Sequence, residues 1–151
     1  MAWFQRGRDP AVTPRDPDPD EEKAALLNDL LTLRGYLNRH ADQLPTVSVV
    51  TAHQIGDVLR AVLDAAGDRP LDAHTAVRLR GFLTDYVPTT VRSFLAVSTD
   101  PDSAGILHEQ LASLLDEAGD LAASARSYDA DALLTQGTFL RTKFSRSDLD
   151  L

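Results

Sequence analysis

Apolar side chains recur every three or four positions along most of this chain, and this spacing limits the available folds more than any other feature. Leu26, Leu30, Leu33 and Leu37 form the clearest stripe, because steps of three and four residues bring side chains to one face of a helix. Strand-like alternation is confined to the segment "VSVV" at 47–50, which is too short to build a sheet. The spacing therefore predicts an all-α protein.

Capping residues and prolines mark where the helices are expected to begin. Asp18 suits the cap and Pro19 the first position of a helix, and Glu21 stands at the third position of a capping box. The segment "TAHQ" at 51–54 has the same reciprocal pattern, with Thr51 as the cap. Later helices are expected to start near Pro70–Asp72, after the Asp100 cap, and at Asp129.

These starts predict one helical bundle of about five helices, with a proline-kinked third helix. The bundle domain is expected to span 19–145. A flexible, disordered N-terminal tail is expected at 1–18, which holds three prolines before its last residue and little to bury, and a flexible C-terminal tail at 146–151.

The segment "DYVPTTVRSFLAV" at 85–97 places Pro88 inside a helical pattern. Either one helix ends before it and another begins, or one helix runs through it with a kink. Val87 is a poor helix cap, and the apolar stripe keeps its phase on both sides of Pro88. Both observations favour a single helix, although a proline inside a helix costs about 3 kcal/mol. The hydroxyls of Thr89 and Thr90 are expected to bond freed carbonyls. A kink serves packing or widens a gap for a ligand or partner.

The "YVPTT" segment, followed by "HEQLASLL" and "DADALLTQGTFLRTKF", resembles the Tyr-x-Pro-Thr-Thr region of the XpaC family, named for 5-bromo-4-chloroindolyl phosphate hydrolysis. It is also similar to a helical region of uncharacterised actinobacterial proteins. The resemblance covers roughly residues 44–144. It implies a helical fold and suggests a hydrolase, but it supplies no catalytic residues.

Composition narrows the function further. The 151 residues carry a formal net charge of −8, and such an acidic chain repels nucleic-acid phosphates. The chain has no cysteine, which excludes disulfides, thiolate metal sites and thiol catalysis. No apolar run approaches the roughly 20 residues of a membrane span, and the first residues do not resemble a signal peptide, so a cytoplasmic location is expected.

No catalytic, cofactor or metal site is expected from the motifs. The four histidines (His40, His53, His74 and His108) lack the spacing of a zinc site, and they are expected on the surface or at helix ends. The acidic run at 16–20 lacks the glycine and glutamate that a calcium loop requires further along. Gly137 lies on the apolar stripe of the last helix. A glycine inside a helix is less stable than an alanine, and close approach of another helix would offset this loss of stability.

Candidate partner-binding residues fall into three groups. The start of the chain combines two aromatic and two basic side chains, which favour a partner groove or an anionic membrane. The proline segment and the last helix supply the other two groups. The full set is Trp3, Phe4, Arg6, Arg8, Tyr86, Pro88, Thr89, Phe139 and Phe144.

The expected function is a non-enzymatic scaffold or regulatory module that binds a protein partner or self-associates. A hydrolase of the XpaC type is the alternative, and peripheral membrane attachment through Trp3 and Phe4 is a third possibility. An enzyme would need a concave site where polar groups converge, for example Asp85, Tyr86 and Thr89 with a histidine.

Overall fold

The structure, a computed structural model, describes residue 15 and residues 18–147, and this part of the chain contains helices and no strand. The all-α prediction is therefore confirmed. The elements are α1 (Pro19–Arg39), a 3-10 turn (Ala41–Gln43), α2 (Thr46–Ala66), α3 (Ala73–Gly81), a π segment (Phe82–Tyr86), α4 (Val87–Ala96) and α5 (Ser103–Ser147). Because α3, the π segment and α4 follow one another without a break, they form one helix, and the described chain has four helices.

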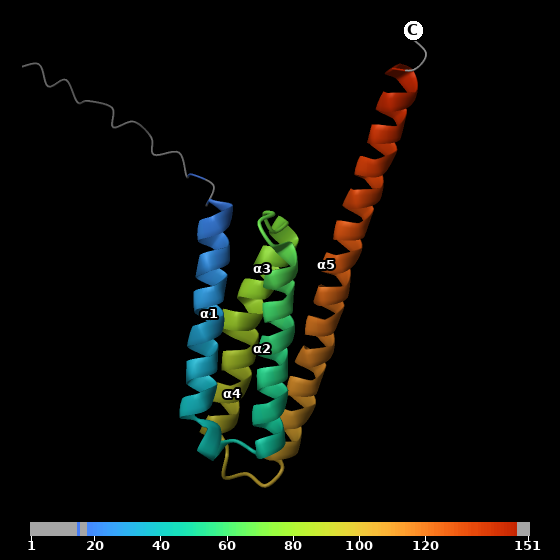
Figure 1. Cartoon of the computed structure of the whole chain (residues 1–151). Coiled ribbons are helices and arrows are strands. Elements are labelled where there is room, and N and C mark those ends of the chain that lie inside the picture. Colours follow the sequence, from blue (N-terminus) through green and yellow to red (C-terminus); the bar gives the residue numbers. More distant parts are fainter. Residues whose placement is uncertain (1–14, 16–17, 148–151) are drawn as a thin grey trace, which may run out of the picture.

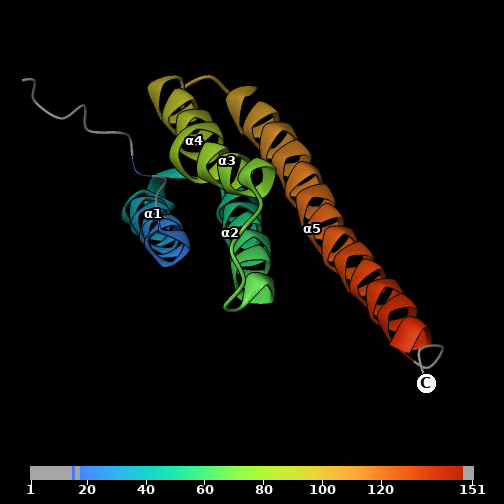
Figure 2. The same cartoon turned by 90° about the horizontal axis from the view of Figure 1, so that it is seen from above.

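The four helices run up and down in turn, so that each is antiparallel to the next along the chain (Figure 1). Seen from above, α2 lies between α1 and α5, and the helix made of α3 and α4 completes the bundle (Figure 2). Short connections of this kind favour antiparallel neighbours. Helix α5 extends well past the other helices (Figure 1).

The core is built from one apolar stripe of each helix. The stripe of α1 is the one that the spacing predicts, with Leu26, Leu30, Leu33 and Leu37 all buried. Phe82 is the largest fully buried side chain, and it lies in the π segment. Burial of each such side chain contributes about 1.5–3 kcal/mol, so the seam between the helices holds the bundle together.

Two of the five predicted helix starts, at Asp18 and at Asp72, are confirmed, and the other three are wrong. The Asp18 side chain caps α1 and Pro19 is its first residue, Gly67 ends α2 with a positive φ of 54°, and Asp72 caps α3. Thr51 is not a cap, because α2 begins five residues earlier at Thr46, directly after Pro45. The Thr51 hydroxyl instead donates to the carbonyl of Val47, 2.9 Å away, inside the helix. The early start also buries Ser48 and packs Val49 against the core.

The predicted fourth and fifth helices are a single helix, α5, of 45 residues. The predicted cap at Asp100 is wrong: α5 starts at Ser103, because Asp100 and Pro101 form a turn in which the Asp100 carbonyl accepts from the Ser103 N–H. No proline or glycine interrupts residues 122–133, so nothing stops the helix at Asp129. The expected tails fall mostly outside the described residues, and α5 continues through 146–147.

One continuous helix carries Pro88, and a π segment directly precedes it. The Val87 N–H donates to the Phe82 carbonyl, five residues back, and the backbone stays in the helical region at Tyr86 and Val87. In a regular α-helix the proline ring would collide with the carbonyl of Thr84. A wider π turn shifts that alignment, which explains how the helix continues. Of the two predicted threonine bonds, Thr90 donates to the Tyr86 carbonyl, whereas Thr89 donates to the Asp85 side chain.

We expect two leucines of α5 to differ sharply in their contribution to stability. Leu111 is 1% exposed, so Leu111→Ala should lower the free energy of unfolding by about 2–5 kcal/mol. Leu134 is 67% exposed, so Leu134→Ala should change it by no more than about 0.5 kcal/mol. Urea unfolding followed by circular dichroism measures both values, and similar losses in the two variants would contradict the packing of α5 described above.

A pH-dependent cap is expected at Asp72. Partial burial raises the pKa of this carboxyl, but hydrogen bonds from the Thr75 N–H (2.9 Å) and hydroxyl (2.5 Å) outweigh it, and the pKa lies below its ordinary value. A lowered folded-state pKa stabilises the fold above the ordinary value, near 3.9, and this gain is lost as pH falls through the folded-state pKa.

Asp72→Ala should therefore cost about 1 kcal/mol at neutral pH, with a smaller loss in acid. Unfolding free energies measured from neutral pH down to about pH 2, so that the series passes well below the ordinary pKa of an aspartate, test this. Asp68→Ala, at an exposed loop position, is the matched control and should stay within about 0.5 kcal/mol at every pH. A constant loss for Asp72→Ala across the range would show that its charge plays no part.

Candidate functional site

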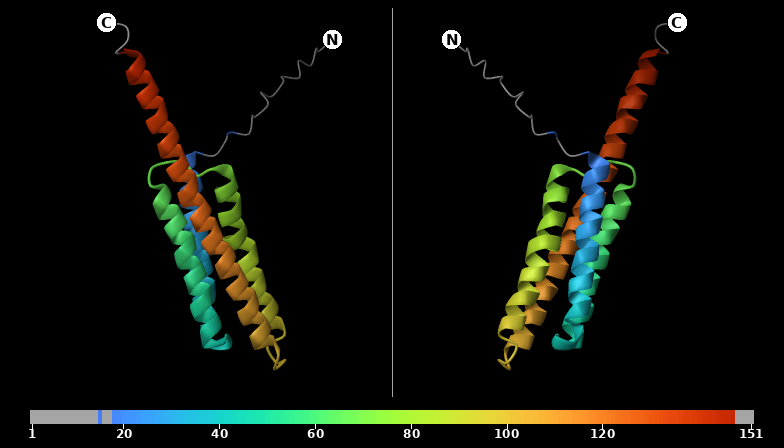
Figure 3. Two further views of the ribbon diagram at one scale, coloured as in Figure 1. Left: turned by 90° about the vertical axis from the view of Figure 1, so that its right-hand side faces the viewer. Right: turned by 90° about the vertical axis from the view of Figure 1, so that its left-hand side faces the viewer.

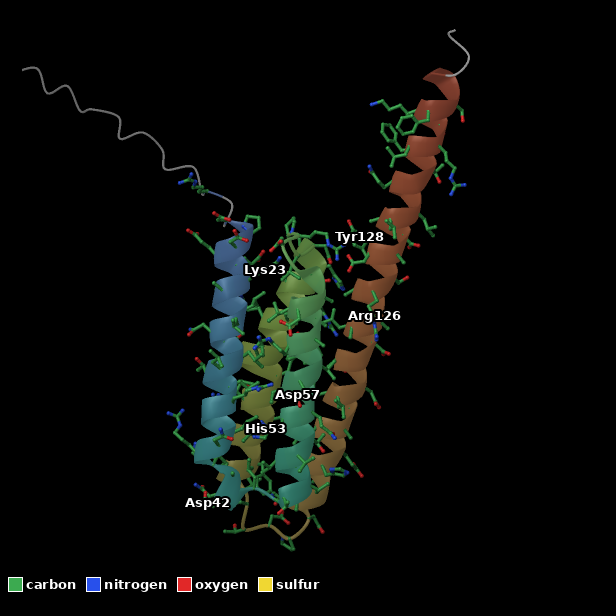
Figure 4. The ribbon with its side chains drawn as sticks, viewed as in Figure 1. Lys23, Asp42, His53, Asp57, Arg126 and Tyr128 are labelled. Atoms are coloured by element: carbon green, nitrogen blue, oxygen red, sulfur yellow. The ribbon has the colours of Figure 1, made fainter. Side chains whose placement is uncertain are left out.

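Helix α5 leaves the bundle near Asp129. The inner side chains of α5 pack on the core as far as Leu121 and Ala125. Arg126 and Tyr128 follow on α5, near the end of α2 (Figure 4). The Arg69 guanidinium holds Asp129 through two contacts of 3.1 Å, which tie the loop after α2 to α5. The rest of α5 stands clear of the other helices in two further views (Figure 3).

The free half of α5 presents large apolar side chains to solvent. Between Tyr128 and Phe144, six of them are 40% to 73% exposed. Five of the six, together with Ala132 and Gln136, form one broad side of the helix, here called the α5 face. Its members are Tyr128, Ala132, Leu133, Gln136, Phe139, Leu140 and Phe144. The sixth, Leu134, points away from it by helix geometry.

The α5 face continues the side of the helix that packs on the bundle. Eighteen residues make five turns of an α-helix, so residues 18 apart point the same way. Leu133, Phe139 and Leu140 follow Leu115, Leu121 and Ala122 by this interval. The three earlier residues pack in or against the core. The face is thus a core-type surface that the described chain does not cover.

Glycine 137 lies at the edge of this face. The sequence suggested that another helix approaches closely there, but no atom within 4 Å would meet a Cβ at this position. The predicted approach is therefore wrong for the described chain.

A second feature is a groove of about 480 Å³ between α3–α4 and α5, beside Pro88. Helix α5 contributes Gln110, Ser113, Leu114 and Glu117 to it, and the other wall holds Arg78, Asp85, Tyr86, Thr89 and Thr90. Tyr86 fits closely over Gly81, where an added Cβ would lie 3.0 Å from the ring. The ring also meets Phe82 edge-on, with ring centres 5.7 Å apart.

The polar contacts of the groove are few and open to water. Arg78 and Glu117 form an ion pair of 3.4 Å across it, with half of the Glu117 side chain exposed. The Thr89 hydroxyl donates to the Asp85 carboxylate at 3.1 Å. Surface pairs of this type contribute about 0–1 kcal/mol, so they do not make a rigid site.

No histidine lines this groove. His74 lies in a neighbouring hollow that shares Arg78 and Glu117 with it, and His40 ends α1. His53 is half-buried on α2, and His108 is exposed on α5. Within residues 18–147 we find no group of three or more histidine or carboxylate side chains placed to hold a metal ion. None of the helices described combines the length and apolar character needed to cross a membrane.

The predicted partner-binding residues separate into two places. Tyr86 and Thr89 line the groove and Pro88 lies beside them, whereas Phe139 and Phe144 belong to the α5 face. Trp3, Phe4, Arg6 and Arg8 lie outside the described residues.

Sequence reasoning missed several members of both sites. It did not name Leu133 and Leu140 among the partner-binding residues, and it did not link Arg78 and Glu117 to the proline segment. The missed signal on α5 is the unbroken helical pattern from Ser103 onward, which is too long for the bundle. The groove has no equivalent signal, since its two walls are about 30 residues apart in the sequence.

No family model, no curated protein and no solved structure matches this chain.

Replacing Pro88 tests how the helix beside the groove tolerates a proline. Alanine restores a backbone donor and removes the ring, so Pro88→Ala should raise the free energy of unfolding by about 1–2 kcal/mol. Thr89→Ala, at the next and exposed position, should change it by about 0.5 kcal/mol or less. Urea titration gives both values, and a large loss in Pro88→Ala would show that the packed ring matters more than the missing bond.

Proposed function

We propose that this chain is a non-enzymatic helical interaction module that binds a protein partner through the α5 face. The observation that carries the proposal is an apolar surface in phase with the bundle core, uncovered along the free half of α5. Contiguous apolar surface of this kind is a mark of interaction sites. Single exposed apolar residues are common, but five large ones on one side of a helix are not.

The energetics of a free helix also favour a partner. An isolated helix of this length is marginally stable in water, because most helix stability comes from packing an amphipathic face. Docking the α5 face would bury leucine and aromatic side chains at about 1.5–3 kcal/mol each, before the costs of association. Aromatic side chains are also the ones that contribute most at the centres of interfaces.

The groove beside Pro88 supports a second candidate, a small-ligand or hydrolytic site as the XpaC resemblance suggests. Its volume falls in the range of small-molecule pockets, and Thr89 bonded to Asp85 has the form of a nucleophile with its base. A kink at Pro88, as the sequence predicts, would help to hold the groove open. It ranks second because a water-exposed carboxylate is a poor base for a hydroxyl, and no histidine lines the groove.

A comparison of matched variants in an affinity pull-down from the native host tests the proposal. Leu140→Ser and Phe144→Ser remove apolar side chains of the α5 face, and a bound protein should be lost in both. Leu134→Ser removes an exposed leucine outside the face, and binding should persist. Thr89→Val alters the groove and should also leave binding intact.

Two results would contradict the proposal. Equal recovery of every bound protein by Leu140→Ser and the unaltered chain would show that the α5 face is not the binding surface. Loss of binding in Thr89→Val alone would assign the interaction to the groove instead.

A further inference from the structure

We propose that the partner of the α5 face is a second copy of this chain, bound antiparallel along the free half of α5. This inference rests on the proposed function, since it names the partner of the same surface. It is argued from three properties of the face: its residue pairing, its charge and its length.

One antiparallel register pairs the face with itself. In an antiparallel pair, residues that face each other have positions equidistant from one midpoint. Two pairs have midpoints within half a residue of Gln136: Leu133 with the partner's Leu140, and Ala132 with the partner's Phe139. The first pair joins two leucines, and the second sets a small side chain against a large one, as interdigitating helices require.

The centre of this register also fits. Gln136 would meet its own copy at the twofold axis, where two amides can bond each other, and such a polar pair selects one register. Gly137 follows Gln136 but lies at the edge of the face, about 100° around the helix from it, and has open space around it.

Charge favours the antiparallel direction. Along the centre line of the face, Asp129 stands at the bundle end and Lys143 at the free end, and Gln136 lies midway between them. In the antiparallel register each Asp129 carboxylate lies near the partner's Lys143, although Arg69 already contacts it. A parallel pair would place like charges side by side, which opposes association.

The length of the free helix agrees with the same register. With Gln136 as the midpoint, Ser147 of one copy lies level with the partner's Ala125, the last residue that packs on the core. A longer overlap would bring the tip of α5 into the space held by the partner's α2. A shorter one would leave Tyr128 or Phe144 uncovered. The overlap spans about 22 residues, or about 33 Å.

Sedimentation equilibrium of the full chain over a hundredfold concentration range measures self-association. We expect a species of twice the 16.4 kDa of one chain that dissociates on dilution. Leu140→Ser should weaken the dimer about a hundredfold, because the symmetric interface loses this leucine twice. Leu134→Ser should leave the dissociation constant unchanged within about twofold.

Single cysteines test the register, because the natural chain has none. Gln136→Cys should form a disulfide-linked dimer under mild oxidation, since the two thiols meet at the axis. Leu133→Cys alone should not, because its two copies lie about 10 Å apart along the helix, beyond disulfide reach. A mixture of Leu133→Cys and Leu140→Cys should cross-link.

The outcomes separate this inference from the proposed function. Ready cross-linking of Leu133→Cys to itself would indicate a parallel pair and overturn the antiparallel register. A chain that stays monomeric at every concentration overturns the second-copy partner. If that monomer still binds another protein, or anionic vesicles, in a way that Leu140→Ser abolishes, a different occupant covers the face. If the monomer binds another protein in this way, the proposed interaction function survives. If it binds anionic vesicles instead, the proposed function fails.

Discussion

Packing of the first half of α5 against α2 and α4 is the contact on which the rest of the structure depends. Leu107, Leu111, Ala118 and Leu121 bring the apolar stripe of α5 onto the other helices, and the buried Phe82 fills the centre. Without this contact α2 and the proline-containing helix would expose their own stripes to water. The same contact sets the direction of α5, so the second half of the helix projects past the bundle in line with the first.

The projecting half follows from a mismatch in length. Helices α1 and α2 have 21 residues each, whereas α5 has 45. A bundle is only as tall as the helices that share its core, so about half of α5 has nothing beside it. Because its apolar spacing does not stop where the bundle stops, the surplus is a surface of core character. That combination is what gives the molecule a candidate function.

The proline segment shows a different relation between local chemistry and fold. Pro88 lacks a donor and its ring is bulky, yet the apolar phase of Leu79, Val87 and Val91 requires a continuous helix. The π segment satisfies both demands, and it places Tyr86 over Gly81, five residues away. The groove lies beside this irregular turn, which is a common location for functional sites.

Much of the architecture could be predicted from local pattern. The stripe of α1, the caps at Asp18 and Asp72 and the single helix through Pro88 all follow from short-range rules. The Thr51 cap was wrong because a start after Pro45 forms the first turn earlier and packs Val49 on the core. Asp129 was wrong as a helix start because a capping residue without a breaker does not interrupt a helix.

The sequence by itself determined that this chain is helical and which side of each helix is apolar, because 3.6 residues per turn convert spacing into a face. It could not determine which apolar faces would be buried, since that depends on the partners that the fold brings alongside. Leu121 and Phe139 are 18 residues apart on the same side of α5, yet one is 5% exposed and the other 60%. Only the tertiary structure decided between them, because the neighbouring helices end before they reach Phe139.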